Sequence, residues 1–413
     1  MAEGIVAHAS RAHPASVSRG ARFSRPLVVN EWEPLVSHSL YSTRTRSFTD
    51  AIIARKSSPD MCLCTNWNRS SQYHRGGIGP RRLVRVREEH ETLPVDDCGQ
   101  SPALGCDVST PGLYLSYYFS DESVRSALAY KSRPDDVFIV GYPKCGTTWL
   151  QYLLCNIFSG GVPPRDTDEF EAKSPFLIFT GAQGAEEMPR PGAIKTHLPF
   201  DKQPYSKEAK YFYVTRNPYD CWVSYYYHMK NTPAYFFADG TFNQFFNLFV
   251  EGKGEFGDYF DHLLSWYEHR NDPNVFFLTY EDLKKDTASW VLKMADFLGK
   301  DYGDRLRSDP ALLMRIVEVS SVSNMKEAFN DAWKSPAIDV PPAVGADGSL
   351  QVTKESLEAA AKKPMTGDFV RKGVVGDWRN HFSPEQIERM KQRVATKMAG
   401  SDVMQLWKEY DLP

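Results

Sequence analysis

The segment from Val137 to Phe158 reads as a buried strand, a glycine-containing loop and a helix, and this order sets the fold class. The strand is a short apolar run over residues 137–141, with polar residues before it and Pro143 after it. Uninterrupted apolar runs of this length are typical of strands that are buried on both faces of a parallel sheet. Residues 148–158 then carry the apolar spacing of a helix. The sequence therefore predicts a strand that leads through a loop into a helix.

The same alternation returns further along the chain. Apolar runs at residues 211–215 and 275–280 each precede a segment with helical spacing, and residues 193–196 form a shorter candidate strand. Strands that alternate with helices build parallel sheets covered by helices. The predicted fold class is therefore α/β, a parallel β-sheet flanked by helices, with a P-loop-like strand, loop and helix.

Two later helices are predicted from local signals alone. Ser383, Pro384 and Gln386 have the residue types of an N-cap, a first-turn proline and a capping-box glutamine, so a helix should run to about Met398. The other helix is predicted where four aromatic side chains share one face, a pattern that is typical of core packing. These residues are Phe242, Phe245, Phe246 and Phe249.

The loop after the first strand has the chemistry of an anion cradle. Lys144 brings a positive charge, Gly146 lets the backbone approach a ligand closely, and the amides up to Thr148 open the predicted helix toward an anion. It is not a Walker A loop, in which lysine stands directly before Ser or Thr, because here the lysine precedes the glycine by two positions. An ordinary strand-to-helix turn is the structural alternative.

Composition and charge narrow the classes of function. The 413 residues are 42% hydrophobic and 24% charged, which suffices for a sizeable core, and the net charge of −3 gives no overall electrostatic reason to bind nucleic acid. No apolar run approaches the roughly 18 residues that a membrane span needs. The seven cysteines are an odd number without the spacings of a disulfide framework or a zinc site. We therefore expect a reducing compartment and a cytoplasmic location.

Residues 1–94 differ from the rest of the chain. They are rich in Ser, Arg, His and Gly and show no sustained apolar period, so we predict a largely disordered extension before a domain over residues 95–413. A mitochondrial transit peptide is the alternative, which the glutamates of this segment disfavour. Within the domain, Pro- and Gly-containing residues 330–363 predict an inserted loop with one short helix over 354–362.

Four sequence blocks, in order, resemble those of the cytosolic sulfotransferases. Residues 142–149, Tyr-Pro-Lys-Cys-Gly-Thr-Thr-Trp, are similar to the family's phosphosulfate loop, with Cys145 where serine is usual. Residues 195–200, Lys-Thr-His-Leu-Pro-Phe, resemble its catalytic segment, and residues 213–226 resemble its 3′-phosphate block. Residues 371–378, Arg-Lys-Gly-Val-Val-Gly-Asp-Trp, resemble its RKGxxGDW signature. One block would be weak support, but four in the same order predict membership.

The resemblance implies 3′-phosphoadenosine 5′-phosphosulfate (PAPS) as the co-substrate. This ligand carries anions at two ends, and the chain offers two separate groups of basic residues; arginine suits bidentate contact with a phosphate and lysine suits a point charge. The phosphosulfate end would be held by Lys144, Cys145, Gly146, Thr147 and Thr148. The 3′-phosphate end would be held by Arg216, Ser224, Arg371, Lys372 and Gly373.

Sulfuryl transfer needs a base that takes the proton of the acceptor. The resemblance places His197 in this role, and imidazole is the ordinary base near neutral pH. Lys195 stands two residues earlier, so on a strand both side chains point to one face. Lys144 and Lys195 would stabilise the charge that develops. The resemblance also implies that Ser224 holds Lys144 away from the donor until an acceptor arrives. Because a sulfuryl group carries less negative charge than a phosphoryl group, we expect no metal ion.

The adenine and acceptor contacts are less well specified. The resemblance implies Trp149, Tyr280 and Ser320 for the adenine, although Val322 stands where the family commonly has an aromatic residue. The acceptor should be a small apolar molecule with a hydroxyl or amine group, such as a phenol, a steroid or a biogenic amine. Candidate aromatic residues for its cavity are Tyr114, Tyr117, Tyr118 and those within 225–260.

Oligomeric state is left open by the sequence. The family's dimerisation signature would fall on residues 379–388, where it is degenerate. Of Arg379, Ser383, Pro384 and Glu388, only Glu388 is retained, so a dimer is possible but is not specified by this route.

Two other functions compete with sulfuryl transfer. A P-loop nucleoside or nucleotide kinase would use ATP and magnesium, with Glu281 and Asp282 after the strand at 275–280 in place of a Walker B carboxylate, but the lysine of the loop is misplaced for it. A non-catalytic nucleotide-binding relative would keep the fold without turnover, but every expected catalytic side chain is present. We therefore favour a PAPS-dependent sulfotransferase.

Overall fold

The structure is a computed structural model that describes residues 104–106, 113–116, 119–332, 343–344, 350–351 and 363–413. The extension predicted over residues 1–94 and the short helix predicted over 354–362 lie outside the described residues.

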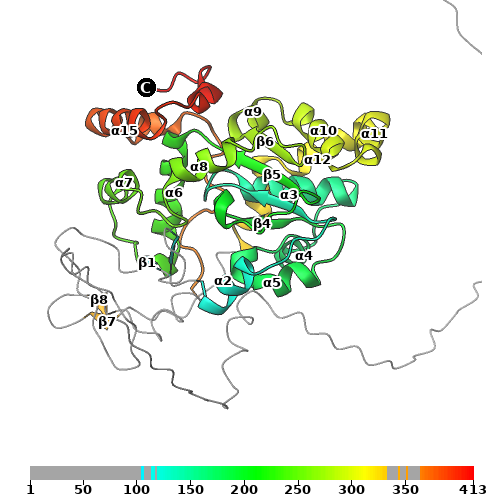
Figure 1. Cartoon of the computed structure of the whole chain (residues 1–413), viewed down its shortest axis with the longest axis horizontal. Helices are drawn as coiled ribbons and strands as arrows, with labels where there is room; N and C mark the ends of the chain where they lie inside the picture. Colours follow the sequence, from blue (N-terminus) through cyan, green and yellow to red (C-terminus); the bar gives the residue numbers. More distant parts are fainter. Residues whose placement is uncertain (1–103, 107–112, 117–118, 333–342, 345–349, 352–362) are drawn as a thin grey trace, which may run out of the picture. The chain divides into compact units, whose positions relative to one another are not determined.

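Four parallel strands form the central sheet (Figure 1). Their order is β4-β3-β5-β6, and Ile139 in the inner strand β3 is paired with Lys195 of β4 on one side and with Phe212 of β5 on the other. The strands are β3 (Val137–Val140), β4 (Ile194–Thr196), β5 (Lys210–Thr215) and β6 (Val275–Thr279). All four strands expected from the apolar runs are present, and the predicted α/β class is confirmed.

Both faces of this sheet are buried. Along β3, Phe138 and Val140 pack into one hydrophobic cluster, while Val137 and Ile139 pack into a second cluster on the opposite side. Successive side chains of a strand point to opposite faces, so a strand that is covered twice needs an apolar residue at every position. This explains the uninterrupted apolar run in the sequence.

Helices and short 3-10 turns connect the strands and cover the two faces (Figure 1). Before β5 these are α2 (Asp121–Leu128), α3 (Thr147–Ser159), α4 (Thr167–Lys173), α5 (Leu177–Glu187) and η1 (Phe200–Lys202). Between β5 and β6 they are α6 (Pro218–Asn231), η2 (Pro233–Tyr235), α7 (Phe242–Val250) and α8 (Tyr259–Tyr267). After β6 they are α9 (Tyr280–Lys285), α10 (Thr287–Leu298), α11 (Lys300–Ser308), α12 (Pro310–Val319), α13 (Val322–Phe329), η4 (Asp377–Asn380), α15 (Pro384–Lys397) and η5 (Val403–Trp407).

The two helices predicted from local signals are confirmed. At the start of α15, the Ser383 hydroxyl accepts from the Gln386 amide and the Gln386 side chain accepts from the Ser383 amide, which completes the capping box. In α7, Phe245, Phe246 and Phe249 are buried, as expected for a helix whose apolar face packs on the core.

Two antiparallel strand pairs lie outside the main sheet. One pair joins β1 (Leu104–Cys106) to β2 (Tyr114–Ser116). The other joins β7 (Ala343–Val344) to β8 (Leu350–Gln351), inside the segment for which only a loop and a helix were predicted. Strands of two residues are too short to show the alternating pattern from which strands are predicted.

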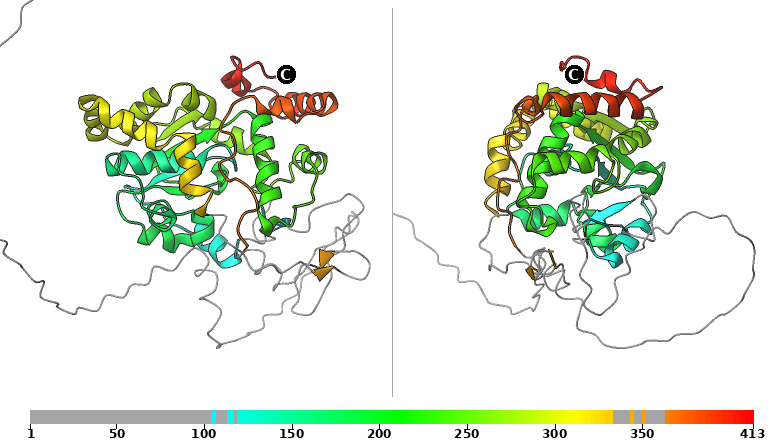
Figure 2. Two further views of the ribbon diagram at one scale, coloured as in Figure 1. Left: turned by 180° about the vertical axis from the view of Figure 1, so that it is seen from behind. Right: turned by 90° about the vertical axis from the view of Figure 1, so that its left-hand side faces the viewer.

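The site is positioned where the carboxyl ends of β3, β4 and β5 meet. The strand order reverses around β3, and crevices at such reversals are where α/β sheets bind ligands. The segment over residues 363–376, coloured orange, runs beside α6 (Figure 2).

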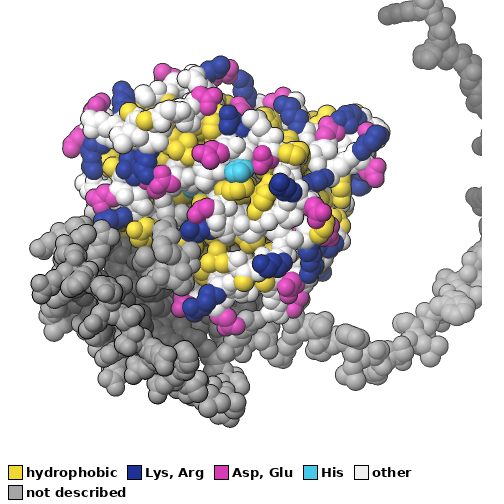
Figure 3. Space-filling view, in the orientation of Figure 1, with side chains coloured by type: hydrophobic (Ala, Val, Ile, Leu, Met, Phe, Trp, Pro, Cys, Tyr) yellow, Lys and Arg dark blue, Asp and Glu magenta, His cyan; other side chains and the backbone are white. Residues whose placement is uncertain are grey.

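On the face shown in Figure 3, basic and acidic side chains are interspersed. No helix in the described part of the chain combines the length and apolar character needed to cross a bilayer.

Candidate active site

The loop after β3 turns sharply before it enters α3. Lys144 has a φ of 69° and Gly146 a φ of 109°, and Gly146 is the N-cap of the helix. A Cβ atom at Gly146 would lie 2.9 Å from Cδ2 of Tyr280, so both the backbone conformation and the close approach of the ring require glycine. The first-turn amides of α3 have no partner within the helix and are available to an anion.

One cavity of about 690 Å³ opens in front of this loop and extends across the carboxyl edge of the sheet. Its wall contains most of the residues predicted from the sequence, although these come from the four separate blocks and, for Tyr280, from a fifth segment. These residues are Lys144, Gly146, Thr147, Thr148, Trp149, Lys195, His197, Arg216, Ser224, Tyr280, Arg371, Lys372 and Gly373.

Two predicted residues lie behind the cavity wall. The thiol of Cys145 is fully buried 3.7 Å from the Cys221 sulfur, and its amide donates to the Tyr142 carbonyl. Ser320 is buried, and its carbonyl accepts from Trp149 Nε1 at 2.8 Å. Neither residue is among those that line the cavity. In the structure, Ser320 supports the Trp149 ring, and Cys145 packs in the core behind the loop.

Arg216 is held at one end of the cavity by contacts that leave it free to bind an anion. Its guanidinium lies 4.4 Å from the centre of the Tyr280 ring, and Nη2 donates to the Val374 carbonyl at 3.2 Å. Nε is buried and has no hydrogen-bond partner among the described residues. A buried cationic donor without an acceptor is costly, so the geometry fits a phosphate at this position.

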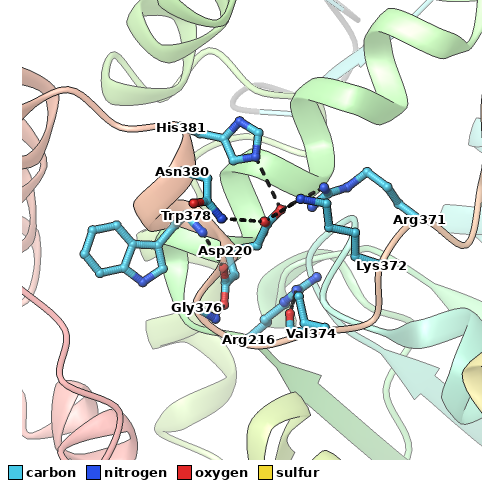
Figure 4. A network of polar contacts seen from close by, with 10 residues as sticks. Arg216, Asp220, Arg371, Lys372, Val374, Gly376, Trp378, Asn380 and His381 are labelled. Atoms are coloured by element: carbon cyan, nitrogen blue, oxygen red, sulfur yellow. Dashed lines mark hydrogen bonds and ion pairs between the residues drawn. The ribbon is translucent and has the colours of Figure 1, made fainter.

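Asp377 fixes the other two cations proposed for the 3′-phosphate, Arg371 and Lys372. Figure 4 shows both cations with their ion pairs as dashed lines. Its carboxylate lies 2.7 Å from both Arg371 Nη1 and Lys372 Nζ. Burial acts to raise the pKa of Asp377, but these ion pairs outweigh burial and hold the pKa far below its usual range. Nearby, the Asp220 carboxylate of α6 accepts from the Gly376 amide at 2.6 Å. The basic loop is therefore fastened to α6, close to Arg216.

Two lysines that line the cavity, Lys144 and Lys195, have lowered pKa values. Burial, together with repulsion from Lys195 and Arg216, lowers the pKa of Lys144 to about 7. Burial lowers the pKa of Lys195 to about 8, although Glu171 opposes the shift. The Lys144 ammonium lies 3.9 Å from the centre of the Phe369 ring. Anions bound here would favour the charged forms and raise both pKa values.

Binding of 3′-phosphoadenosine 5′-phosphate (PAP), the desulfated donor, should therefore take up protons at pH 8. We expect an uptake of about one proton per PAP, mainly because Lys144, which a pKa of about 7 leaves mostly neutral at pH 8, regains its charge when an anion binds. Titration calorimetry in buffers of different ionisation enthalpy measures this number. Lys144→Met should remove most of it, whereas Lys293→Met, which changes a lysine packed on Trp290 outside the cavity, should not. Proton-neutral binding would contradict the lysine assignment.

His197 is oriented so that one ring nitrogen is available as a base. Nδ1 hydrogen-bonds the Gly141 carbonyl, and since a carbonyl only accepts, Nδ1 must carry the proton. Nε2 then holds the lone pair. Burial and the charge of Lys195 hold the pKa of His197 well below its usual value, so the ring is neutral near pH 7. The ring is a proton acceptor in its resting form.

An apolar box surrounds the imidazole. The centres of the Phe176 and Phe256 rings lie 5.1 Å and 5.2 Å from that of His197, and Phe119 contacts both phenylalanines edge-on. All three phenylalanines line the cavity. Phe256 lies within the run 225–260 that the sequence nominated, but sequence reasoning missed Phe119 and Phe176, which come from separate segments without a shared period. Of the tyrosines nominated instead, Tyr114 does not line the cavity, and positions 117 and 118 lie outside the described residues.

Glu281, one of the two carboxylates that a kinase would need, has a structural role. Glu281 accepts from the amide and side chain of Asn217 and from Trp407 Nε1, and it does not line the cavity. Within the residues that the structure describes, no three His, Cys, Asp or Glu side chains are grouped so as to hold a metal ion. In place of a metal ion, the cavity wall contains cationic side chains, among them Lys144 and Arg216.

Comparison with known proteins identifies the family to which the chain is similar. A family model described as "Sulfotransferase domain" matches residues 134–336 and 347–402. The chain is 32% identical to sulfotransferase 1C2 of Homo sapiens over 285 residues, which span 67% of this chain and 87% of the relative. It is 32% identical to the amine sulfotransferase of Oryctolagus cuniculus over 284 residues, which span 67% of this chain and 85% of the relative.

A solved structure is also similar. The crystal structure of mouse sulfotransferase SULT7A1 complexed with PAP aligns with a TM-score of 0.53 at 30% sequence identity. The alignment covers 75% of this chain and 98% of that chain.

Proposed function

The chain belongs to the sulfotransferase family, and from this premise we propose that His197, Lys144 and Lys195 carry out the transfer of a sulfuryl group from PAPS to a small acceptor. The family assignment makes the protein a PAPS-dependent sulfotransferase; the residue roles are our proposal. The observation that carries these roles is that Lys144, Arg216 and His197 line a single cavity although their blocks are far apart in sequence.

The donor would lie with its two anionic ends on the two groups of cations. The crystallisation of mouse SULT7A1 with PAP supports a PAPS site, and the buried Nε of Arg216 supports a phosphate at the far end. We assign the 3′-phosphate to Arg216, Arg371 and Lys372. We assign the phosphosulfate to Lys144 and the amides at the start of α3, with Trp149 and Tyr280 beside the adenine.

The reaction forms a bond between the acceptor oxygen and sulfur and breaks the bond between sulfur and the oxygen of the 5′-phosphate. His197 Nε2 takes the acceptor proton, which is possible because the proton on Nδ1 is engaged with Gly141. Lys144 and Lys195, charged when the anionic donor is bound, stabilise the negative charge that develops on the departing oxygen. The apolar box excludes water from the imidazole.

We propose a metal-independent reaction, since two lysines and backbone amides supply the positive charge. A cytoplasmic location also remains a proposal. It is supported by the cysteine spacing and by the free thiols of Cys145, Cys155 and Cys221.

Incubation of the full chain with PAPS labelled with ³⁵S and a panel of phenols, alcohols and amines tests the function. We expect label on an acceptor, release of an equal amount of PAP, and no change when a chelator is added. The control is ATP labelled at the γ-phosphate with magnesium and the same panel. Phosphate transfer from ATP that needs magnesium, without sulfate transfer, would overturn the proposal.

A further inference from the structure

A buried carboxylate lines the acceptor end of the cavity. Glu255 is 4% exposed and directly precedes Phe256, a wall of the apolar box around His197. No ion pair to Glu255 occurs among the described residues, although the cavity holds several cations. Burying an ionised carboxylate without a counter-charge is costly, so its presence beside the acceptor site needs an explanation.

Three neutral donors hold this carboxylate in place. The Ser116 amide donates to Oε1 at 3.2 Å, and the hydroxyls of Tyr225 and Tyr235 donate to Oε2 at 3.2 Å and 2.7 Å. These hydrogen bonds stabilise the anion and fix its orientation, but they leave its charge uncompensated. Burial raises the pKa of Glu255, although these hydrogen bonds oppose the shift, so a positively charged ligand would stabilise the ionised form of a carboxyl group that the fold already holds in place.

Two further polar atoms that can accept a hydrogen bond lie at the same end of the cavity. The His228 ring lies beside both tyrosines that hold Glu255, with centre distances of 6.2 Å to Tyr225 and 5.7 Å to Tyr235. His228 Nδ1 and Thr232 Oγ1 are buried and have no hydrogen-bond partner within the described part of the chain. Burial, then the charges of Lys144 and Lys195, hold the pKa of His228 well below its usual value, so the ring is neutral.

We propose that Glu255, His228 and Thr232 form a subsite for an ammonium group, and that the preferred acceptors are phenols that carry a primary or secondary amine. This inference rests on the proposed sulfuryl transfer and specifies the acceptor for it. The aromatic ring lies in the box of Phe119, Phe176 and Phe256, with its hydroxyl toward His197.

The chemistry of the three side chains suits an ammonium better than a neutral group. An ammonium offers donors only; a carboxylate and a hydroxyl oxygen accept, and so does His228 Nδ1 when the neutral ring carries its proton on Nε2. An ammonium also supplies the counter-charge that Glu255 lacks. A carboxylate or sulfate on the acceptor would be repelled by Glu255, and a purely apolar group would leave His228 and Thr232 without partners.

The wild-type full chain distinguishes these acceptors directly. Steady-state rates with PAPS are compared for tyramine, for tyrosol, in which a hydroxyl replaces the amine, and for 4-propylphenol. We expect kcat/KM for tyramine to exceed the other two by at least about tenfold, because charge-assisted contacts to a buried carboxylate are strong. Equal or higher kcat/KM for the neutral phenols would overturn the inference.

Glu255→Gln removes the charge and keeps the shape of the side chain. We expect this variant to lose about tenfold or more in kcat/KM for tyramine and to change by less than about threefold for 4-propylphenol. The control is Glu251→Gln, an exposed glutamate paired with Lys253, which should change neither value. An unaltered tyramine preference in folded Glu255→Gln would contradict the assignment.

A second variant covers the case in which Glu255→Gln does not fold. His228→Phe removes one acceptor from the same subsite and should reduce the ratio of kcat/KM for tyramine to that for 4-propylphenol; an unchanged ratio would count against the subsite. Failure of the proposed function looks different, because then no phenol would receive sulfate although PAP still binds.

Discussion

Replacing His197 with alanine is expected to lower kcat for sulfuryl transfer by about 10²- to 10⁴-fold while PAP binds almost as before. The reason is geometric. His197 presents Nε2 to the cavity because Nδ1 is engaged with Gly141, whereas the proposed contacts of PAP are to the α3 loop and to the cluster around Arg216. Removing the ring therefore removes the base and leaves the nucleotide site in place.

Single-turnover transfer and calorimetric titration with PAP measure the two quantities separately. His269→Ala is a suitable control, because this histidine pairs with Asp272 at 2.8 Å and does not line the cavity. If His197→Ala kept its kcat, histidine would have no part in the chemistry. If it lost PAP affinity and transfer together, the ring would be part of the donor site instead.

The second large effect is expected at Arg216. Arg216→Ala should weaken PAP binding by about 30-fold, or about 2 kcal/mol, as expected for a lost charge-assisted contact. Adenosine 5′-phosphate, which lacks the 3′-phosphate, should bind the wild type and the variant with equal affinity. The loss should thus appear only with the ligand that carries the second anion.

Arg270→Ala provides a matched control for this substitution. Its guanidinium also packs on a tyrosine, 3.9 Å from the centre of the Tyr267 ring, and donates to a backbone carbonyl, but it lies outside the cavity. We expect no change in the dissociation constant of PAP. If Arg216→Ala weakened adenosine 5′-phosphate as much as PAP, Arg216 would not be the partner of the 3′-phosphate.

The sheet and its first loop were predictable because their signals are local. The strand at residues 137–140 is an apolar run with polar residues before it, and the sharp backbone turn of the following loop is made by Lys144 and Gly146 themselves. The start of α15 was predictable for the same reason, since its capping box lies within four residues.

The acceptor end was not predictable, because its residues are brought together only by the fold. Phe119 precedes α2, Phe176 precedes α5 and Glu255 follows α7, and none of them belongs to a sequence period that marks a binding surface. The role of Asp377 was hidden for a similar reason. The block over residues 371–378 indicated two cations for a phosphate, but it did not reveal that a buried carboxylate holds both.

Cys145 is a residue that was nominated only because of its position in a motif. Its place in the loop suggested contact with the donor, but its thiol points into the core toward Cys221. A contact of Cys145 with the donor stays a prediction, and it would not involve the thiol.

A crystal structure of the full chain with PAP bound would test the central claim most directly. The proposed arrangement requires the 3′-phosphate on Arg216, Arg371 and Lys372, the 5′-phosphate at Lys144 and the start of α3, and His197 Nε2 facing the open oxygen of that phosphate. A 3′-phosphate directed into solvent, or a 5′-phosphate out of reach of His197, would contradict it.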